Sequence, residues 1–269
     1  MPFVERTRGK APYRIHYEVR GAKDAPPLVL VMGLGFSSGA WGSLPDRLSA
    51  RFRVVTVDNR GTGRSTAPRG PFRTRDLADD VASVLDDLGV AKAHVFGISM
   101  GGMIASELVL RHPTKVDRLL LAATFAGYLR STKPSFGAMV DLLACAFSPS
   151  GAALARIARL LVSDAYYADH PEAFAAWIRG TGSAPARTAA RQMLAVGLHD
   201  TTRRLANVRA PTVVLTGDAD RLVPAKNSHV LAKLIPGARL VLLPGAGHCF
   251  AVEREDATVD VVVSHFLDS

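Results

Sequence analysis

Short, uniformly apolar runs recur along the chain and alternate with longer segments whose apolar residues follow a helical spacing. Uniformly apolar runs are typical of strands that helices cover on both faces, as in a parallel sheet. The runs expected to form such strands are residues 28–32, 54–57, 93–96, 119–122, 212–216 and 240–243. The helical spacing predicts helices at residues 44–50, 76–88, 103–110, 225–235 and 253–267. This alternation of strands and helices predicts an α/β fold.

Two parts of the chain depart from this alternation. Residues 3–8 and 14–19 alternate apolar and polar positions, which predicts an edge hairpin and brings the mostly parallel sheet to eight strands. Between 125 and 205 no strand-like run occurs. Alanine-rich amphipathic stretches there predict helices at residues 136–146, 152–161, 171–178 and 185–197. We therefore expect residues 1–124 and 206–269 to form the core, and residues 125–205 to form a helical lid inserted after the sixth strand.

The composition argues against several classes of partner and cofactor. The formal charge of +9 comes mostly from arginines spread through every segment, so we expect no nucleic-acid partner. No apolar run reaches the roughly 18 residues that cross a bilayer, and residues 1–20 lack a signal-peptide pattern. We therefore expect a cytoplasmic protein without a membrane partner. Cys145 and Cys249 lie in no metal-ligand spacing, and Gly61-Thr62-Gly63 lacks the rest of a dinucleotide fingerprint, so we expect no metal or cofactor.

The strand expected at 93–96 runs directly into Gly97-Ile98-Ser99-Met100-Gly101, after which a helix begins. This pattern predicts a nucleophile elbow, a sharp turn that lifts a serine hydroxyl above the sheet edge. Glycines two residues before and after the serine leave room for the strand and helix to approach. The N-terminus of the helix favours negative charge at the same point. Ser99 is therefore the candidate nucleophile.

A serine nucleophile needs a histidine base and a carboxylate that orients the histidine. Of the eight histidines, only His248 lies in a small-residue loop directly after a predicted strand, where an imidazole reaches the carboxyl edge of the sheet. The preceding strand is followed by Asp218 and Asp220. We assign the acid to Asp220, which lies further from the strand end, whereas Asp218 is placed to cap the turn. The resulting order, Ser99, Asp220, His248, is the order that a nucleophile elbow requires.

An oxyanion formed at an attacked carbonyl needs two preorganised N–H donors. The backbone N–H of Met100, the residue after the nucleophile, is one candidate. The N–H of Leu34 is the other, because Gly33 and Gly35 let the loop turn this amide toward the site.

Four apolar side chains lie near the predicted site and are candidates for lining a substrate pocket. They are Phe36, Trp41, Val223 and Phe250. Each is equally well explained as part of the core. A pocket built from them would take a small molecule with an apolar acyl or ring portion.

The motifs together resemble the α/β-hydrolase superfamily, and the resemblance covers nearly the whole chain. They are Gly-Leu-Gly at 33–35, DNRGTGRS at 58–65, GISMGG at 97–102, GDADRLVP at 217–224 and GAGH at 245–248. In detail the chain is similar to the enol-lactonase and small-ester hydrolase branch, where a methionine often follows the serine and a four-helix lid follows the sixth strand. The resemblance implies Ser99, Asp220 and His248 as the triad, and Leu34 and Met100 as the oxyanion donors.

The chain departs from this pattern at the start of the oxyanion loop. The family usually has His-Gly there, and this chain has Met32-Gly33. A methionine cannot form the hydrogen bonds of a histidine, so the loop needs a different brace.

A serine at position 99 fits acyl transfer to water, whereas relatives that displace at an alkyl carbon use an aspartate there. We therefore expect a serine hydrolase that cleaves a small carboxylic ester or lactone through an acyl-enzyme. One alternative is a non-hydrolytic enzyme that uses the same triad for C–C bond cleavage, cyclisation or perhydrolysis. Another is a ligand-binding receptor with slow turnover.

Overall fold

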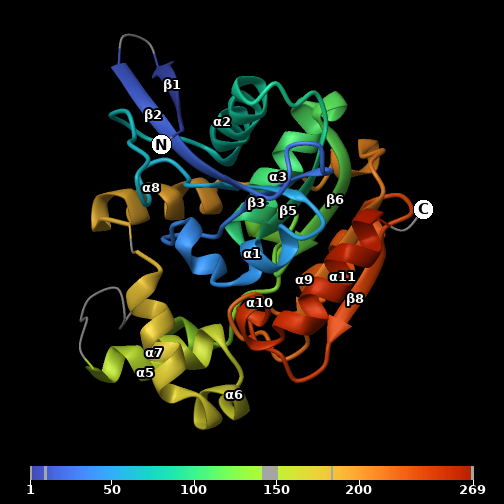
Figure 1. The fold of residues 1–269 in the computed structure, drawn as a ribbon. Helices are drawn as coiled ribbons and strands as arrows, with labels where there is room; N and C mark the ends of the chain where they lie inside the picture. Colours follow the sequence, from blue (N-terminus) through green and yellow to red (C-terminus); the bar gives the residue numbers. More distant parts are fainter. Residues whose placement is uncertain (1, 9–10, 141–150, 183, 268–269) are drawn as a thin grey trace.

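The computed structural model describes residues 2–8, 11–140, 151–182 and 184–267. Its strands are β1 (Phe3–Arg8), β2 (Ala11–Arg20), β3 (Pro27–Val31), β4 (Arg53–Val57), β5 (Ala93–Ile98), β6 (Val116–Ala122), β7 (Thr212–Gly217) and β8 (Arg239–Leu243). They form one sheet in the order β1-β2-β4-β3-β5-β6-β7-β8 (Figure 1). β2 is antiparallel to both β1 and β4, and the remaining neighbours are parallel. The predicted mostly parallel eight-stranded sheet is confirmed.

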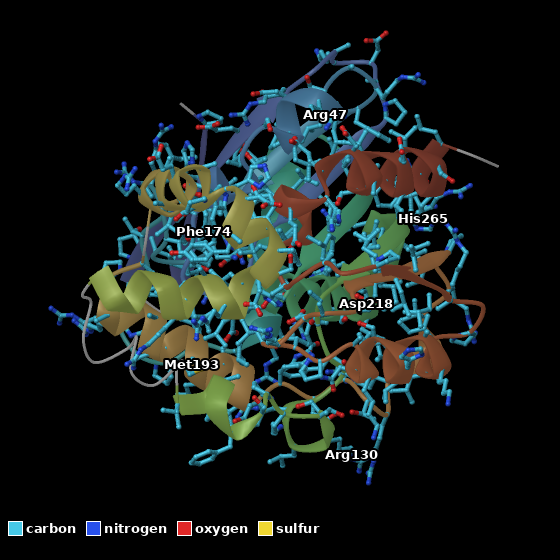
Figure 2. The ribbon with its side chains drawn as sticks, turned by 90° about the horizontal axis from the view of Figure 1, so that it is seen from below. Arg47, Arg130, Phe174, Met193, Asp218 and His265 are labelled. Atoms are coloured by element: carbon cyan, nitrogen blue, oxygen red, sulfur yellow. The ribbon has the colours of Figure 1, made fainter. Side chains whose placement is uncertain are left out.

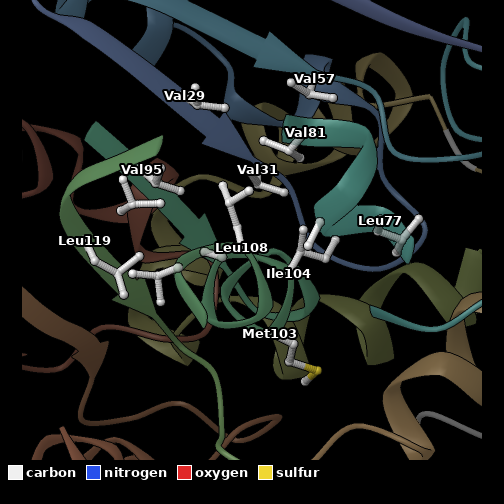
Figure 3. Packing of buried hydrophobic residues seen from close by; sticks show 14 of the residues in the cluster. Val29, Val31, Val57, Leu77, Val81, Val95, Met103, Ile104, Leu108 and Leu119 are labelled. Atoms are coloured by element: carbon white, nitrogen blue, oxygen red, sulfur yellow. The ribbon is translucent and has the colours of Figure 1, made fainter. Parts of the chain in front are cut away.

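Helices cover both faces of this sheet, because its strands are apolar on both sides. One face carries α2 (Thr74–Asp87), α3 (Met100–Arg111) and α9 (Lys226–Leu234), and the other carries α1 (Leu44–Leu48) and α11 (Glu255–Leu267). Figure 3 shows part of the first core, where Val31 and Val57 of the sheet share a cluster with Val81 of α2 and Ile104 of α3. Each fully buried side chain of this kind contributes about 1.5–3 kcal/mol. The two cores thereby fix the strand ends and the loops that follow them.

A group of helices lies between β6 and β7, and we call this part of the chain (residues 125–205) the helical insertion. Its helices are η3 (Tyr128–Arg130), α5 (Gly151–Leu161), α6 (Asp164–Asp169), α7 (Pro171–Gly180) and α8 (Ala186–Gly197). Residues 136–140 are also helical, and the rest of the helix expected at 136–146 lies outside the described residues.

Three helices of the insertion, α5, α6 and α7, form one group at the lower left of Figure 1. The side chain of Phe174, on α7, is fully buried in this group and shares a small cluster with Leu161 and Val162 (Figure 2). The same cluster packs against Phe36 and Leu222, which lie in loops at the edge of the sheet. The insertion is therefore joined to these loops by apolar contacts. In the described part of the chain, no helix combines the length and apolarity needed to cross a bilayer.

Candidate active site

Ser99 occupies the sharp turn between β5 and α3. Its backbone has a φ of +57° and a ψ of −122°. A left-handed conformation of this kind costs a residue that carries a Cβ about 1–3 kcal/mol. The N–H of Ser99 donates to the carbonyl of Ala122 at 2.8 Å, which ties the turn to the end of β6. The surrounding sheet thus holds a strained serine in the geometry of a nucleophile elbow.

Close approach of neighbouring backbone explains the two glycines that flank this turn. A Cβ at Gly97 would lie 2.2 Å from the carbonyl oxygen of Gly101, and a Cβ at Gly101 would lie 1.9 Å from that of Val31. A carbon and an oxygen atom that are not bonded cannot approach each other this closely. The missing side chains therefore let α3 begin directly beside β3 and β5, with its first-turn N–H groups next to Ser99.

His248 and Asp220 form a buried, hydrogen-bonded pair. Nδ1 of His248 lies 2.8 Å from Oδ2 of Asp220, and the two residues are 4% and 5% exposed. Oδ1 of Asp220 accepts the N–H groups of Leu222 and Val223 at 2.9 and 2.8 Å. Because the carboxylate acts as an acceptor in all three contacts, Nδ1 of His248 carries the proton. Nε2 is then the ring nitrogen left for proton transfer.

Asp218 makes a different contact, although it lies only two residues from Asp220. Its exposed side chain accepts the N–H of Gly245 at 2.6 Å, and so fastens the start of the loop that carries His248 (Figure 2). The loops that carry the acid and the histidine follow β7 and β8, which run parallel to β5. Parallel strands end at the same edge of a sheet, so the structure brings Ser99, Asp220 and His248 to one edge.

The loop that follows β3 lies directly against the serine. A Cβ at Gly33 would lie 3.1 Å from Cβ of Ser99 and 3.6 Å from its Oγ. Met100 is the first residue of α3, so its N–H has no partner within the helix. Within the described residues, neither this N–H nor that of Leu34 donates a hydrogen bond. Both predicted oxyanion donors are therefore unpaired near Ser99.

Asn59 braces the start of this loop. Its buried side chain donates from Nδ2 to the carbonyl oxygen of Met32 at 2.8 Å. Met32 itself packs in the core with 7% of its surface exposed. The position of Asn59 at the end of β4 was the only signal for this role in the sequence, and we did not predict it.

Glu253, at the end of α10 (Phe250–Glu253), braces the histidine loop in a similar way. Its Oε2 accepts the N–H of Gly247 at 2.8 Å and the N–H of Ser163 at 3.2 Å. Its Oε1 accepts the hydroxyl of Ser163, the N-cap of α6. Glu253 is 7% exposed and connects the residue before His248 to the insertion. No motif pointed to it, because it lies where the sequence predicts the start of a plain amphipathic helix.

The four candidate pocket residues fall into two groups. Trp41 and Phe250 are fully buried in the core between the sheet and α11, where the ring of Trp41 packs edge-on to Phe96 with 4.9 Å between centroids. These two side chains are therefore part of the core. The sequence allowed this as the alternative to a role in the substrate pocket. Phe36 packs against the insertion, and Val223 lies in the loop that carries Asp220.

The loop that follows β3 holds the predicted donor Leu34, and we call it the oxyanion loop. A polar cavity of about 250 Å³ opens at its far end, next to Ser37 and Ser38. Its lining contains none of the three candidate catalytic side chains. Asp58 lines it and accepts hydrogen bonds from the N–H groups of Ser38 and Arg64 at 2.8 and 2.9 Å, and contacts Nδ1 of His16 at 3.0 Å. These contacts fasten the DNRGTGRS loop to the oxyanion loop, so we assign them a structural role.

Cys249 follows His248 and is the one cysteine among the described residues. Burial, reinforced by the charges of Asp220 and Glu253, raises the pKa of its thiol far above the usual range. A thiol that stays protonated is a weak nucleophile and does not compete with a serine. In the part of the chain that the structure describes, no three His, Cys, Asp or Glu side chains are grouped to hold a metal ion.

Comparison with known proteins places this geometry in a family. The model of the alpha/beta hydrolase fold family matches residues 26–255. "Putative carbamate hydrolase RutD" from Caulobacter sp. (strain K31) is 31% identical over 260 residues, covering 94% of this chain and 95% of that protein. The enol-lactonase from Burkholderia xenovorans LB400 has a TM-score of 0.84 at 28% identity, covering 95% of this chain and 97% of that one.

The esterase RhEst1 from Rhodococcus sp. ECU1013 has a TM-score of 0.85 at 25% identity, and the match covers 98% of each chain. The names of these relatives, together with the family model, support hydrolase activity. Because the family model spans most of the sequence, the chain belongs to the alpha/beta hydrolase fold family.

Proposed function

We propose that the protein is a serine hydrolase that cleaves a small carboxylic ester or lactone through an acyl-enzyme intermediate. The observation that carries the proposal is the strained turn at Ser99, which opens at the same sheet edge as the bonded pair of His248 and Asp220. In this role Ser99 is the nucleophile and His248 the general base. Asp220 holds the imidazole in the tautomer whose Nε2 accepts a proton.

The chemistry follows from these roles. Nε2 of His248 takes the proton of Ser99 Oγ as the oxygen attacks the carbonyl carbon, and the N–H groups of Leu34 and Met100 stabilise the oxyanion. Collapse of the tetrahedral intermediate breaks the bond to the leaving oxygen, which takes the proton back from His248. Water, deprotonated by His248, then attacks the acyl-enzyme. Collapse of this second intermediate breaks the bond between the acyl carbon and Ser99 Oγ, which takes the proton from His248 as the acid leaves. With a lactone the leaving oxygen stays attached to the acyl group, and the product is a hydroxy acid.

We infer that the helical insertion (residues 125–205) acts as a lid over a core formed by residues 1–124 and 206–269. The support is its position after β6 and its apolar contacts with Phe36 and Leu222, in the loops after β3 and β7. A lid placed in this way would supply an apolar wall to the substrate site. It would also exclude water while the oxyanion forms, which strengthens hydrogen bonds to the charge.

Carbamate hydrolysis is the second candidate, because the curated relative described above carries that name. A carbamate carbonyl is attacked by the same nucleophile and its oxyanion needs the same two donors. It is less electrophilic than an ester carbonyl, because the nitrogen lone pair donates into it. The ratio of kcat/KM for p-nitrophenyl acetate to that for p-nitrophenyl N-methylcarbamate, measured beside a simple lactone, distinguishes the two substrate classes.

The two neighbouring aspartates provide a matched test of the triad. Asp220→Asn removes the carboxylate that fixes the His248 tautomer and should lower kcat about 10⁴-fold. Asp218→Asn keeps an oxygen acceptor for Gly245 and should leave kcat within about twofold of the wild type. Ester hydrolysis and labelling by a fluorophosphonate probe are measured in both variants and in Ser99→Ala. Equal losses in the two aspartate variants, or activity retained in Ser99→Ala, would contradict the proposal.

A further inference from the structure

Gln192, on helix α8 of the insertion, reaches the oxyanion loop. Its Oε1 accepts the N–H of Gly35 at 2.8 Å, and its Nε2 lies 3.5 Å from the carbonyl oxygen of Arg60. The side chain is fully buried, with 0% of its surface exposed. A buried amide in this position joins three segments that are far apart in the sequence.

The two contacts require the two ends of a carboxamide. Gly35 presents a donor and needs an acceptor, whereas Arg60 presents an acceptor and needs a donor. A glutamate would satisfy the first contact but would place a carboxylate against a carbonyl oxygen. A methionine of similar shape would satisfy neither and would leave a buried N–H unpaired, at a cost of about 1–3 kcal/mol.

The insertion holds both polar groups of Gly35. Its carbonyl oxygen accepts the N–H of Ala184 at 2.7 Å, while its N–H is bound by Gln192. Gly35 has a φ of +82°, and a Cβ there would have nothing within 4 Å, so packing around this residue does not hold the turn. The hydrogen bonds from the insertion therefore fix the orientation of the peptide groups on either side of Gly35, the first of which joins Leu34 to Gly35.

We propose that Gln192 is a positioning residue of the oxyanion hole. This inference rests on the proposed serine hydrolase function. By binding the N–H of Gly35, Gln192 removes that amide from competition for the oxyanion and fixes the Leu34–Gly35 peptide plane. This restrains the backbone torsions of Leu34, and so holds the adjacent peptide group, which carries the N–H of Leu34, with that N–H toward Ser99. It supplies, from the insertion, a second brace in addition to Asn59, in a loop that begins with Met32 in place of the family's histidine.

Losing the hydrogen bond from Gln192 should weaken stabilisation of the transition state more than it weakens binding of the substrate. A rotated Leu34 amide no longer meets the oxyanion, whereas binding of the neutral ester is little changed. Interactions made only in the transition state lower kcat and kcat/KM by the same factor when they are removed. We expect Gln192→Met to lower both about 10- to 100-fold, which is less than the loss of a complete oxyanion donor.

The test measures kcat and KM for p-nitrophenyl acetate, and the inhibition constant of phenylboronic acid, in the wild type, Gln192→Met and Gln192→Glu. Phenylboronic acid adds to a serine oxygen and places a boronate oxygen in the oxyanion hole, so its affinity should fall by the same factor as kcat, with KM within twofold. Gln192→Glu keeps the acceptor for Gly35, so its kcat and its affinity for phenylboronic acid should lie between those of the wild type and Gln192→Met. Met193→Ala, which shortens an exposed neighbour on α8, should match the wild type (Figure 2).

Unchanged kcat in a folded Gln192→Met, or a fall in kcat without a matching loss of phenylboronic acid affinity, would overturn the assignment. If thermal melting shows that Gln192→Met does not fold, Gln192→Glu is judged by the same ratio of kcat to boronate affinity. Ser99→Ala distinguishes failure of the serine mechanism from failure of the role assigned to Gln192. Retained activity in Ser99→Ala contradicts the serine mechanism itself, whereas its loss beside a fully active Gln192→Met contradicts only the role of Gln192.

Discussion

At the scale of single residues, the backbone around Ser99 decides which side chains are possible. The carbonyl oxygen of Val31 occupies the space where a side chain at position 101 would begin. Ser99 itself has a φ of +57°, and the strand and helix can meet at this turn because the residues two positions before and after it are glycines. The geometry of this turn therefore depends on residues close together in the sequence, so the turn can be identified from a short stretch of sequence.

Adding one methyl group at position 101 tests this packing. Gly101→Ala would place Cβ 1.9 Å from the Val31 oxygen and force α3 away from β3, so we expect a loss of about 3 kcal/mol or more in the free energy of unfolding. Gly197→Ala is the matched control, because a Cβ at the end of α8 meets nothing within 4 Å and should be neutral or stabilising by up to about 1 kcal/mol. Urea unfolding measures both. Equal stability of the two variants would contradict the close approach.

The contact between Asp220 and His248 could be predicted, because both residues lie in loops directly after apolar strands and the chemistry of a triad limits the choice. Their catalytic roles stay a prediction. The partners of Asn59, Gln192 and Glu253 could not be predicted from sequence patterns. Each side chain binds at least one backbone group far away in the sequence, at Met32, Gly35 and Ser163 respectively, and these contacts form only when the sheet and the insertion have packed. An ordinary polar residue in a loop or on a helix carries no local signature of such a contact.

At the level of helices and strands, the loops that carry the candidate site are held by neighbouring helices and not by strands alone. Apolar periodicity predicted the strands and most helices, since burial on a sheet imposes that spacing. It predicted a single closing helix at 253–267, whereas the structure has α10 ending at Glu253 and α11 beginning at Glu255. Glu253 bonds the histidine loop and the insertion at this break.

Neutralising the charge of Glu253 tests the clamp between the histidine loop and α6. Glu253→Gln can keep one oxygen for the N–H groups of Gly247 and Ser163, but its NH2 group then faces the Ser163 hydroxyl that donates to Oε1. The substitution should cost about 1–3 kcal/mol of stability and lower kcat. The control is Glu255→Gln, which alters the exposed bond to Ser43 and should cost less than about 1 kcal/mol. Thermal melting and ester hydrolysis are measured in both variants. A Glu253→Gln variant as stable and active as Glu255→Gln would argue against the clamp.

At the scale of the whole molecule, two histidines that are buried and neutral make stability depend on pH. Burial lowers the pKa of His199 and of His265 to about 4, from an unfolded value near 6.5. His199 is 2% exposed and bonds Thr74, and His265 lies 3.0 Å from the carbonyl oxygen of Leu119. The stability linked to these neutral side chains is complete above pH 6.5. It is lost as the pH falls toward 4, because the unfolded chain binds the protons first.

We therefore expect the free energy of unfolding to fall steadily between pH 6.5 and 4. His199 is the better buried of the two, and its share is roughly 2–3 kcal/mol. Urea unfolding at pH 7, 5.5 and 4.5 measures the slope, and His199→Gln should be less stable at pH 7 but less sensitive to acid. If the free energy of unfolding of His199→Gln depends on pH as steeply as that of the wild type, His199 does not titrate in this way.

The proposed mechanism requires Ser99 to carry the acyl group during turnover, and mass spectrometry of the trapped intermediate can detect this group. The protein is mixed with p-nitrophenyl acetate, quenched in acid within milliseconds and digested. We predict one acetyl group on the peptide that contains Ser99 in the wild type, and none on that peptide in Ser99→Ala, with turnover abolished. Acetylation at another residue together with hydrolysis retained in Ser99→Ala would contradict the account.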